Sequence, residues 1–252
     1  MLLPKRLTED QIREIQKLAQ AGISITNMAK KLRLKKTTVY YHARNHCRKM
    51  TTLDINLLTE FEKGYIIGFF LGDGCFNFGR KTPRYIVRFY LDAERDRDIS
   101  TFLCSVLQKG RKRVSVFNRE ANIILRVSSK ELVDFIQKYV EYKRSPDNRL
   151  EKELSKCKEI SEEFQYGILS GVIDSDGHVH EHLGTEIKTV SDILQQGILD
   201  VLKDLRIKAT VKVIDAMENS FSKRPRYVIY IPSAEMKAHQ NRIRSVKVRY
   251  YL

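Results

Sequence analysis

Tryptophan is absent from this 252-residue sequence, and proline is scarce, with only five residues. Long apolar runs are missing as well. One of the longest, residues 65–71, is far shorter than the roughly 20 residues of a membrane-spanning helix, so we expect no membrane partner. The four cysteines, at positions 47, 75, 104 and 157, form no C-x-x-C pair, which argues against a structural zinc site. No signal peptide is apparent, so we expect reduced thiols in a cytoplasmic protein.

Acidic residues are in the minority: 31 Asp and Glu stand against 46 Lys and Arg, which leaves a net charge of +15. Such an excess favours a polyanionic partner, and nucleic acid is the polyanion left once a membrane is excluded. A basic protein without such a partner is the alternative. Binding to DNA would place the protein at the nucleoid, and an organelle of a eukaryote stays open as a location.

Residues 7–45 have the periodicity of three short helices, and we assign residues 1–48 to a small all-α domain. Thr8 begins a capping box, Ser24 is placed to cap the second helix and Thr37 the third. The stretch 22–32 resembles the helix-turn-helix of resolvase-like DNA-binding proteins, whose last helix points its N-terminal residues at base edges. A helical bundle with solvated lysines is the alternative. The candidate DNA contacts here are Lys35, Lys36, Thr37, Thr38 and Tyr41.

A polar linker, 49–58, precedes two halves that repeat each other, 59–147 and 161–252, and the charged segment 148–160 joins them. Each half begins with a helix that is apolar nearly all round. Alternating segments that predict strands follow, with helical stretches between them. The expected strands are 85–91, 113–117, 123–127, 186–189, 209–214 and 227–231. The predicted fold class is α+β, a duplicated domain with pseudo-two-fold symmetry.

Small residues recur every four positions in both apolar helices. Glycine inside a helix costs up to about 1 kcal/mol against alanine, so a face lined with glycine needs a reason. Close approach of two helices supplies one, because small residues let the backbones touch. We therefore expect the two helices to pack along these faces. The residues concerned are Gly64, Gly68 and Gly72 in the first half, and Gly167, Gly171 and Ser175 in the second.

Both helices end at an Asp-Gly pair, at Asp73 and Asp176. One such pair alone is most often a turn, but two copies that close glycine-lined helices favour a shared site. Two carboxylates at helix C-termini repel each other unless a cation neutralises them. Oxygen ligands suit Mg²⁺, with Mn²⁺ or Ca²⁺ as alternatives, and the carbonyls of Gly72 and Ser175 would complete the metal shell. Such ions can promote phosphodiester hydrolysis.

The stretches 68–74 (GFFLGDG) and 171–177 (GVIDSDG) resemble the two motifs that name the LAGLIDADG homing endonucleases, and the likeness extends over about residues 53–252. It implies a monomer with two αββαββα repeats, whose strands form a DNA-binding saddle. It also implies that the last acidic residue of each motif, Asp73 and Asp176, binds the catalytic metals. The first Asp of the motif is present in the second stretch as Asp174, but the first stretch has Leu71 at that position. Since that position is not the metal ligand, Leu71 does not indicate inactivity.

The family also places a lysine near the metals from the end of each repeat, and aligning the two halves selects Lys143 and Lys247. A surface lysine is the alternative for each. His178, His180 and His182 alternate onto one face, as a zinc site or, in the preferred interpretation, facing DNA or solvent. Strand alternation gives the sheets' candidate DNA contacts as Arg84, Arg88, Arg111, Arg113, Lys188, Lys212 and Arg226.

These features predict a metal-dependent endonuclease that cuts both strands of a double-stranded DNA site. A transcriptional regulator built on a retired endonuclease scaffold is the main alternative. The acidic pair favours the enzyme, because a retired scaffold has no need to keep it. An RNA-splicing maturase is a third hypothesis, against which the helix-turn-helix argues, since that motif reads duplex DNA.

Overall fold

The computed structural model describes residues 7–21, 23–46, 53–77, 85–110, 113–145, 148–155, 160–215 and 224–251. The chain forms two compact units, residues 1–50 and 51–252, each with its own hydrophobic core. Within the described residues, no helix has both the length and the apolar character that crossing a bilayer requires.

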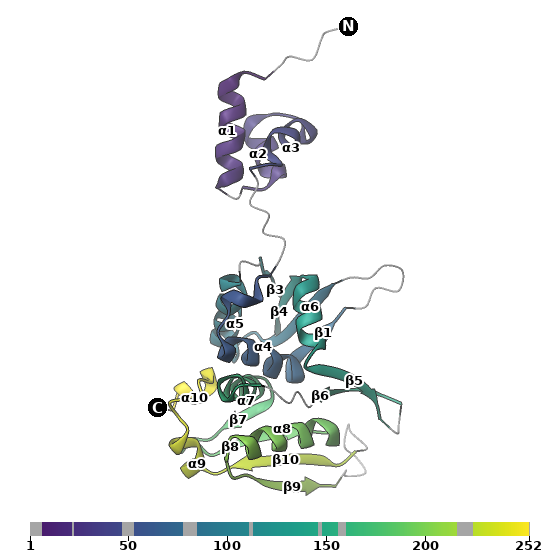
Figure 1. Ribbon diagram of the computed structural model, residues 1–252, viewed down its shortest axis with the longest axis vertical. Helices are drawn as coiled ribbons and strands as arrows, with labels where there is room; N and C mark the ends of the chain where they lie inside the picture. Colours follow the sequence, from purple (N-terminus) through teal and green to yellow (C-terminus); the bar gives the residue numbers. More distant parts are fainter. Residues whose placement is uncertain are drawn as a thin grey trace. The chain divides into compact units, whose positions relative to one another are not determined.

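The N-terminal unit consists of α1 (Glu9–Gln20), α2 (Ile25–Leu32) and α3 (Lys36–Ala43), drawn in purple in Figure 1. The capping box at Thr8 and the Ser24 cap are both present. The prediction that Thr37 caps the third helix is wrong, because α3 already begins at Lys36, with Lys35 as its N-cap. Arg33 ends α2 in the left-handed conformation (φ 53°), which turns the chain within three residues.

The second unit repeats the element order αββαββα, which confirms the predicted α+β fold class. A single 3₁₀ turn, Ile55–Leu57, precedes the first half. The first half comprises α4 (Glu60–Asp73), β1 (Gly74–Phe76), β2 (Ile86–Asp92), α5 (Arg97–Lys109), β3 (Ser115–Asn118), β4 (Asn122–Ser128) and α6 (Lys130–Gln137). The second half comprises α7 (Glu162–Asp176), β7 (Gly177–Val179), β8 (Thr185–Thr189), α8 (Asp192–Asp204), β9 (Thr210–Ile214), β10 (Arg226–Ile231) and α9 (Ser233–Ala238), and α10 (Val246–Arg249) follows it.

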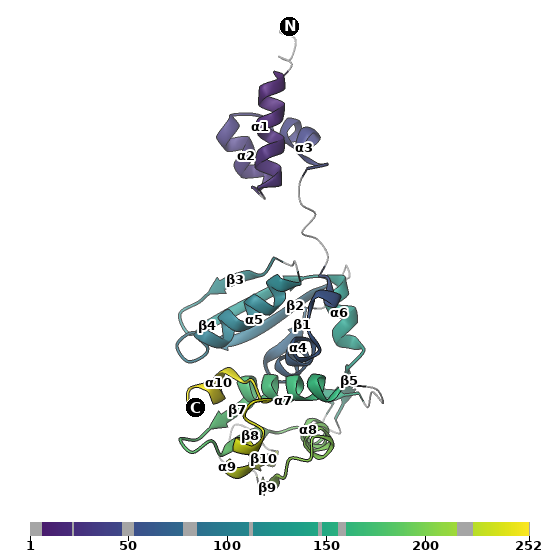
Figure 2. The same cartoon turned by 60° about the vertical axis from the view of Figure 1, so that its left-hand side comes forward.

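Each half folds into one antiparallel sheet, and the strand orders correspond: β1-β2-β4-β3 in the first half and β7-β8-β10-β9 in the second. The helices α4 and α7 lie side by side between the two sheets, as the two views in Figures 1 and 2 show. Burial alternates along β2, with Val87 and Phe89 buried on the core side and Tyr90 exposed on the other. The faces turned away from the core are called the outer faces below.

A two-stranded hairpin between the halves corrects the predicted linker 148–160. It consists of β5 (Val140–Arg144) and β6 (Leu150–Leu154), paired antiparallel. The sequence of β6, LEKEL, is dominated by charged residues. A charged run is normally solvated, so its pattern gave no strand signal.

Candidate active site

The seam between α4 and α7 is built on its small residues, as the four-residue spacing predicts. A Cβ added to Gly64 or Gly68 would overlap backbone atoms of α7. A Cβ added to Gly167 or Gly171 would overlap backbone atoms of α4 in the same way. The two backbones therefore touch along the seam, and larger side chains at these four positions would force the helices apart.

The seam brings the two motif ends together. A Cβ on Gly72 would lie against the Ser175 side chain and 2.7 Å from a carboxylate oxygen of Asp176. Burial, together with the negative charges of Asp176 and Asp96, raises the pKa of Asp73 to about 6, against the opposing charges of two lysines. Burial raises the pKa of Asp176 too. Two partly desolvated carboxylates at one point form an electrostatically unfavourable pair, which a bound cation would relieve.

Lys152, on β6 of the hairpin between the halves, is the lysine that reaches the end of α4. Its ammonium donates hydrogen bonds to the last carbonyls of α4, at 2.8 Å from Phe70 O, 2.9 Å from Leu71 O and 2.8 Å from Gly72 O. Burial lowers the pKa of Lys152 to about 8, while the charges of the two motif aspartates oppose that shift. A mainly buried ammonium therefore lies beside the Asp pair.

The prediction that Lys143 occupies this place is wrong. Lys143 pairs with Glu153, and half of its side chain is exposed. The register of the hairpin explains the difference: Tyr142 is the residue opposite Lys152, so Lys143 projects from the other face of the strands. The alignment of the two halves passed over Lys152, because it matched Lys143 to Lys247 and left Lys152 in the predicted linker 148–160.

Lys247 does lie where the alignment of the halves places it. It belongs to α10, and its ammonium donates to the carbonyl oxygens of Ser175, at 3.3 Å, and Gly177, at 2.9 Å. Lys247 also lowers the pKa of both Asp73 and Asp176 through its charge. Each helix end thus has one aspartate and one ammonium group.

The oxygen atoms at the seam suit a hard divalent ion. The carboxylates of Asp73 and Asp176 are close enough there to interact electrostatically, and the carbonyls of Gly72 and Ser175 lie at the same helix ends. In the structure each of these carbonyls accepts a hydrogen bond from a lysine. In the part of the chain that the structure describes, no cluster of three His, Cys, Asp or Glu side chains suits a metal. A metal here would therefore take its remaining ligands from backbone carbonyls, water or a substrate.

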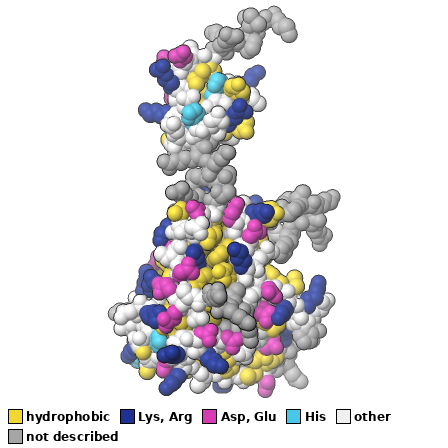
Figure 3. All heavy atoms as spheres, viewed as in Figure 1, with side chains coloured by type: hydrophobic (Ala, Val, Ile, Leu, Met, Phe, Trp, Pro, Cys, Tyr) yellow, Lys and Arg dark blue, Asp and Glu magenta, His cyan; other side chains and the backbone are white. Residues whose placement is uncertain are grey.

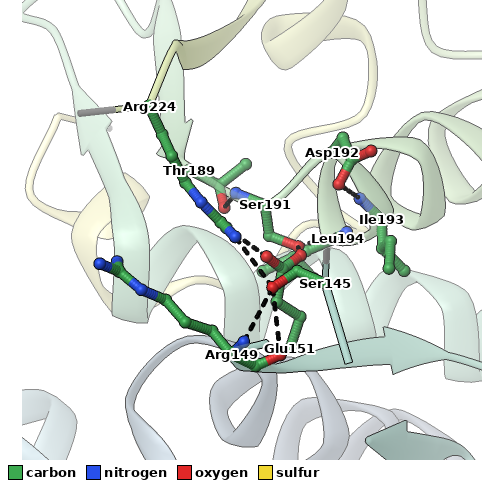
Figure 4. Close-up of polar contacts among 9 residues, drawn as sticks. All are labelled: Ser145, Arg149, Glu151, Thr189, Ser191, Asp192, Ile193, Leu194 and Arg224. Atoms are coloured by element: carbon green, nitrogen blue, oxygen red, sulfur yellow. Dashed lines mark hydrogen bonds and ion pairs between the residues drawn. The ribbon is translucent and has the colours of Figure 1, made fainter. Parts of the chain in front are cut away.

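The strand that carries Lys152 is anchored to the second half. The preceding residue, Glu151, points to the opposite side and is 7% exposed. It accepts a hydrogen bond from the Ser191 hydroxyl at 2.6 Å and pairs with Arg224, as Figure 4 shows. Since Ser191 is the N-cap of α8, the second half holds the strand whose lysine caps a helix of the first.

Of the comparisons with known proteins, the one with solved structures identifies the fold. No protein-family model and no curated protein matches the sequence. Among solved structures, the chain is similar to I-DmoI in complex with DNA and Mn, with 16% identity, a TM-score of 0.55, and coverage of 74% of this chain and 98% of that one. The homing endonuclease has also been solved in complex with DNA and Ca; that structure matches with 16% identity, a TM-score of 0.53, and coverage of 75% and 92%. The chain has the LAGLIDADG fold.

The outer face of the second LAGLIDADG sheet carries three of the predicted DNA contacts. Lys188 on β8 and Lys212 on β9 both lie opposite Val228 on β10, so the three side chains form one row. Arg226 is on the same face, two positions before Val228. Both lysines and Arg226 are exposed. Lys188 also pairs with Glu186, at 2.8 Å, which reduces the positive charge of the row.

The outer face of the first LAGLIDADG sheet has a row of its own. Arg88 on β2 lies opposite Cys75 on β1 and Arg126 on β4. Arg126 was not predicted, although it alternates with buried residues of β4. Arg113 is exposed just before β3, whereas Arg84 and Arg111 lie outside the described residues. On the face that Figure 3 shows, Lys and Arg side chains are intermixed with Asp and Glu and form no single basic patch.

The N-terminal unit exposes most of its predicted DNA contacts. Lys35, Lys36 and Thr37 are exposed at the start of α3, and Thr38 is half-buried. Tyr41 is 63% exposed, and its ring lies under the guanidinium of Arg44, 5.1 Å from the ring centre.

The three histidines after Asp176 do not gather into a zinc site. The rings of His178 and His180 are in edge contact, and His180 approaches Glu186 at 3.5 Å. His182 lies in the exposed turn that follows. Of the cysteines, Cys75 and Cys104 are free thiols, while Cys47 and Cys157 lie outside the described residues.

Proposed function

We propose that the protein is a site-specific, divalent-metal-dependent DNA endonuclease that hydrolyses both strands of a double-stranded site. The observation that carries this proposal is the meeting of Asp73 and Asp176 at the end of the glycine seam, with Lys152 and Lys247 beside them. The LAGLIDADG fold supports it, since I-DmoI, a homing endonuclease, has been solved with DNA and Mn and with DNA and Ca.

The chemistry follows from the groups at the seam. When bound, divalent ions supply a hydroxide nucleophile and neutralise charge on the leaving oxygen. Asp73 and Asp176 would hold these ions, with carbonyl oxygen from Gly72 and Ser175. The ammonium groups of Lys152 and Lys247 provide positive charge that offsets the charge developing on a scissile phosphate. The Asp73 pKa of about 6 leaves this carboxylate ionised, and able to bind a cation, at neutral pH.

Binding would use both units. The outer faces of the two sheets present Arg88, Lys188, Lys212 and Arg226, which suit contacts with phosphates and base edges. The N-terminal unit would add affinity by inserting α3 into a major groove. One chain contains both halves of the seam, so we propose that it acts as a monomer.

The test starts from a plasmid library with random inserts, incubated with Mg²⁺ or Mn²⁺. Wild type is expected to linearise a rare subset, from which the target is sequenced. Asp73→Asn and Asp176→Asn are each expected to bind this target and to leave at least one strand intact. Double-strand cutting at the wild-type rate by either variant would refute the site. Binding without cutting by wild type, with either metal, would support a regulator instead.

A further inference from the structure

Asp174, two residues before the end of α7, is a fully buried carboxylate that accepts hydrogen bonds from four donors. Its Oδ1 accepts from the Ser245 hydroxyl at 2.6 Å and from the Lys247 amide at 3.0 Å. Its Oδ2 accepts from the Tyr65 hydroxyl at 2.8 Å and from the Val246 amide at 2.9 Å. A buried carboxylate is costly without such partners, so the set of four donors is what makes this position tolerable.

Three of the four donors belong to one short segment, residues 245–247. Ser245 is also the N-cap of α10, because its hydroxyl accepts from the Val248 amide at 3.2 Å. Asp174 therefore fixes the point at which α10 begins. Lys247 is held at both ends: its amide by Asp174, and its ammonium by carbonyls on either side of Asp176.

We propose that Asp174 is a positioning residue for catalysis, which holds the ammonium of Lys247 at the shared metal site by anchoring residues 245–247. The inference rests on the proposed endonuclease function and deepens it. Asp174 itself does not touch the substrate. Its effect passes through Lys247. A catalytic group that is displaced by about 1 Å can slow the reaction on the order of 100-fold, so a free backbone at residues 245–247 would slow cleavage.

The first half shows why this carboxylate is not simply a relic of duplication. Leu71 stands at the equivalent place in α4 and is buried among apolar side chains. The lysine at the end of α4, Lys152, lies on the hairpin strand β6, and its neighbour Glu151 accepts a hydrogen bond from Ser191. A carboxylate at position 71 would therefore have no segment to anchor, whereas one at position 174 has residues 245–247.

The experiment is a double-mutant cycle with the selected target DNA and Mg²⁺. Asp174→Asn, Lys247→Met and the double variant are compared with wild type in single-turnover cleavage, and DNA affinity is measured in Ca²⁺. We expect Asp174→Asn to slow cleavage roughly 10-fold to 100-fold with unchanged affinity. The double variant is expected to be no slower than Lys247→Met alone. Multiplying effects would refute the positioning role.

Two matched hydroxyl deletions sharpen the test. Ser245→Ala removes a donor from the segment that carries Lys247, whereas Tyr65→Phe removes a donor to the same carboxylate from α4. We expect Ser245→Ala to slow cleavage several-fold more than Tyr65→Phe; equal effects would contradict the proposal. Combining Asp174→Asn with Lys152→Met should multiply the two effects, because Lys152 is anchored elsewhere.

A structural readout separates failure of this inference from failure of the proposed function. If wild type does not cleave, the endonuclease proposal fails, and crystal structures of wild type and Asp174→Asn decide the inference. We expect the Lys247 ammonium to leave the carbonyl of Gly177 in the variant. An unmoved Lys247 would overturn the proposal. Ser245→Ala serves for the same comparison if Asp174→Asn does not fold.

Discussion

At the end of α4, in the first half of the LAGLIDADG unit, Lys152 is supplied by a strand of the hairpin between the halves. At the end of α7, in the second half, Lys247 is supplied by the short helix α10. The elements around these lysines are otherwise duplicated, down to the strand order of the sheets. The supporting carboxylates differ as well: Glu151 secures the first lysine's strand and Asp174 the second lysine's helix.

This difference indicates which features the fold requires twice. The glycine seam and the terminal aspartates recur because the helices pack on each other and neither can change alone. The ammonium groups need only lie at the helix ends, so the lysine at each end can belong to a different structural element. The predictions below test whether the halves are as equivalent at the seam, and as different around it, as the structure indicates.

The largest effect is expected at the seam. Gly68→Val and Gly171→Val should each lower the free energy of unfolding by at least about 3 kcal/mol, because the added side chain overlaps backbone of the partner helix. Urea denaturation measures this change. Gly197→Ala, in α8, is the control: its Cβ meets Leu154 Cβ at 3.2 Å, and we expect a change within about 1 kcal/mol. A seam variant as mild as this control would show that the two helices are not in backbone contact.

The two lysines of the hairpin form the next matched pair. Lys152→Met should slow cleavage of the selected target roughly 100-fold to 1,000-fold, because it removes positive charge from the site. Lys143→Met should leave the rate within about two-fold, since Lys143 lies at the surface with Glu153. Single-turnover cleavage rates of both variants show which lysine acts at the site. A larger loss of rate for Lys143→Met than for Lys152→Met would restore Lys143, the residue that the sequence alignment selected.

A smaller effect concerns stability without metal. The Asp73 pKa of about 6 exceeds the usual 3.8, so the folded state binds this proton more tightly than the unfolded state. The ionised carboxylate therefore destabilises the fold as pH rises from about 4 to about 6. Asp73→Asn should exceed wild type in stability by about 1–3 kcal/mol at pH 7 in EDTA, and by less at pH 4. Chemical denaturation at both pH values measures this; a constant difference would contradict the shifted pKa.

The smallest effect belongs to the N-terminal unit. Lys35→Ala and Lys36→Ala should each weaken DNA binding and reduce the slope of log affinity against log salt by about 1 if the residue contacts a phosphate. Cleavage of bound DNA should stay unchanged, because the seam lies in the other unit. Fluorescence anisotropy at several salt concentrations gives the slope. Unchanged slopes for both variants would leave α3 without a DNA-binding role.

The sequence predicted the features that rest on local repetition. Glycine spacing, a property of one helix face, indicated the seam and hence the meeting of Asp73 with Asp176. Lys152 was beyond reach, because its place depends on the pairing of β5 with β6, and a charged strand carries no apolar period. Asp174 was recognised as part of a motif, but its anchoring of residues 245–247 links positions about 70 residues apart and becomes visible only in the fold.

The central claim is that Asp73 and Asp176 share bound divalent ions. A crystal structure of the wild-type protein with its selected DNA and Mn²⁺, phased at the manganese absorption edge, locates these ions directly. We predict an anomalous peak within about 2.5 Å of a carboxylate oxygen from each aspartate. Manganese bound to only one of them, or to neither, would contradict the account.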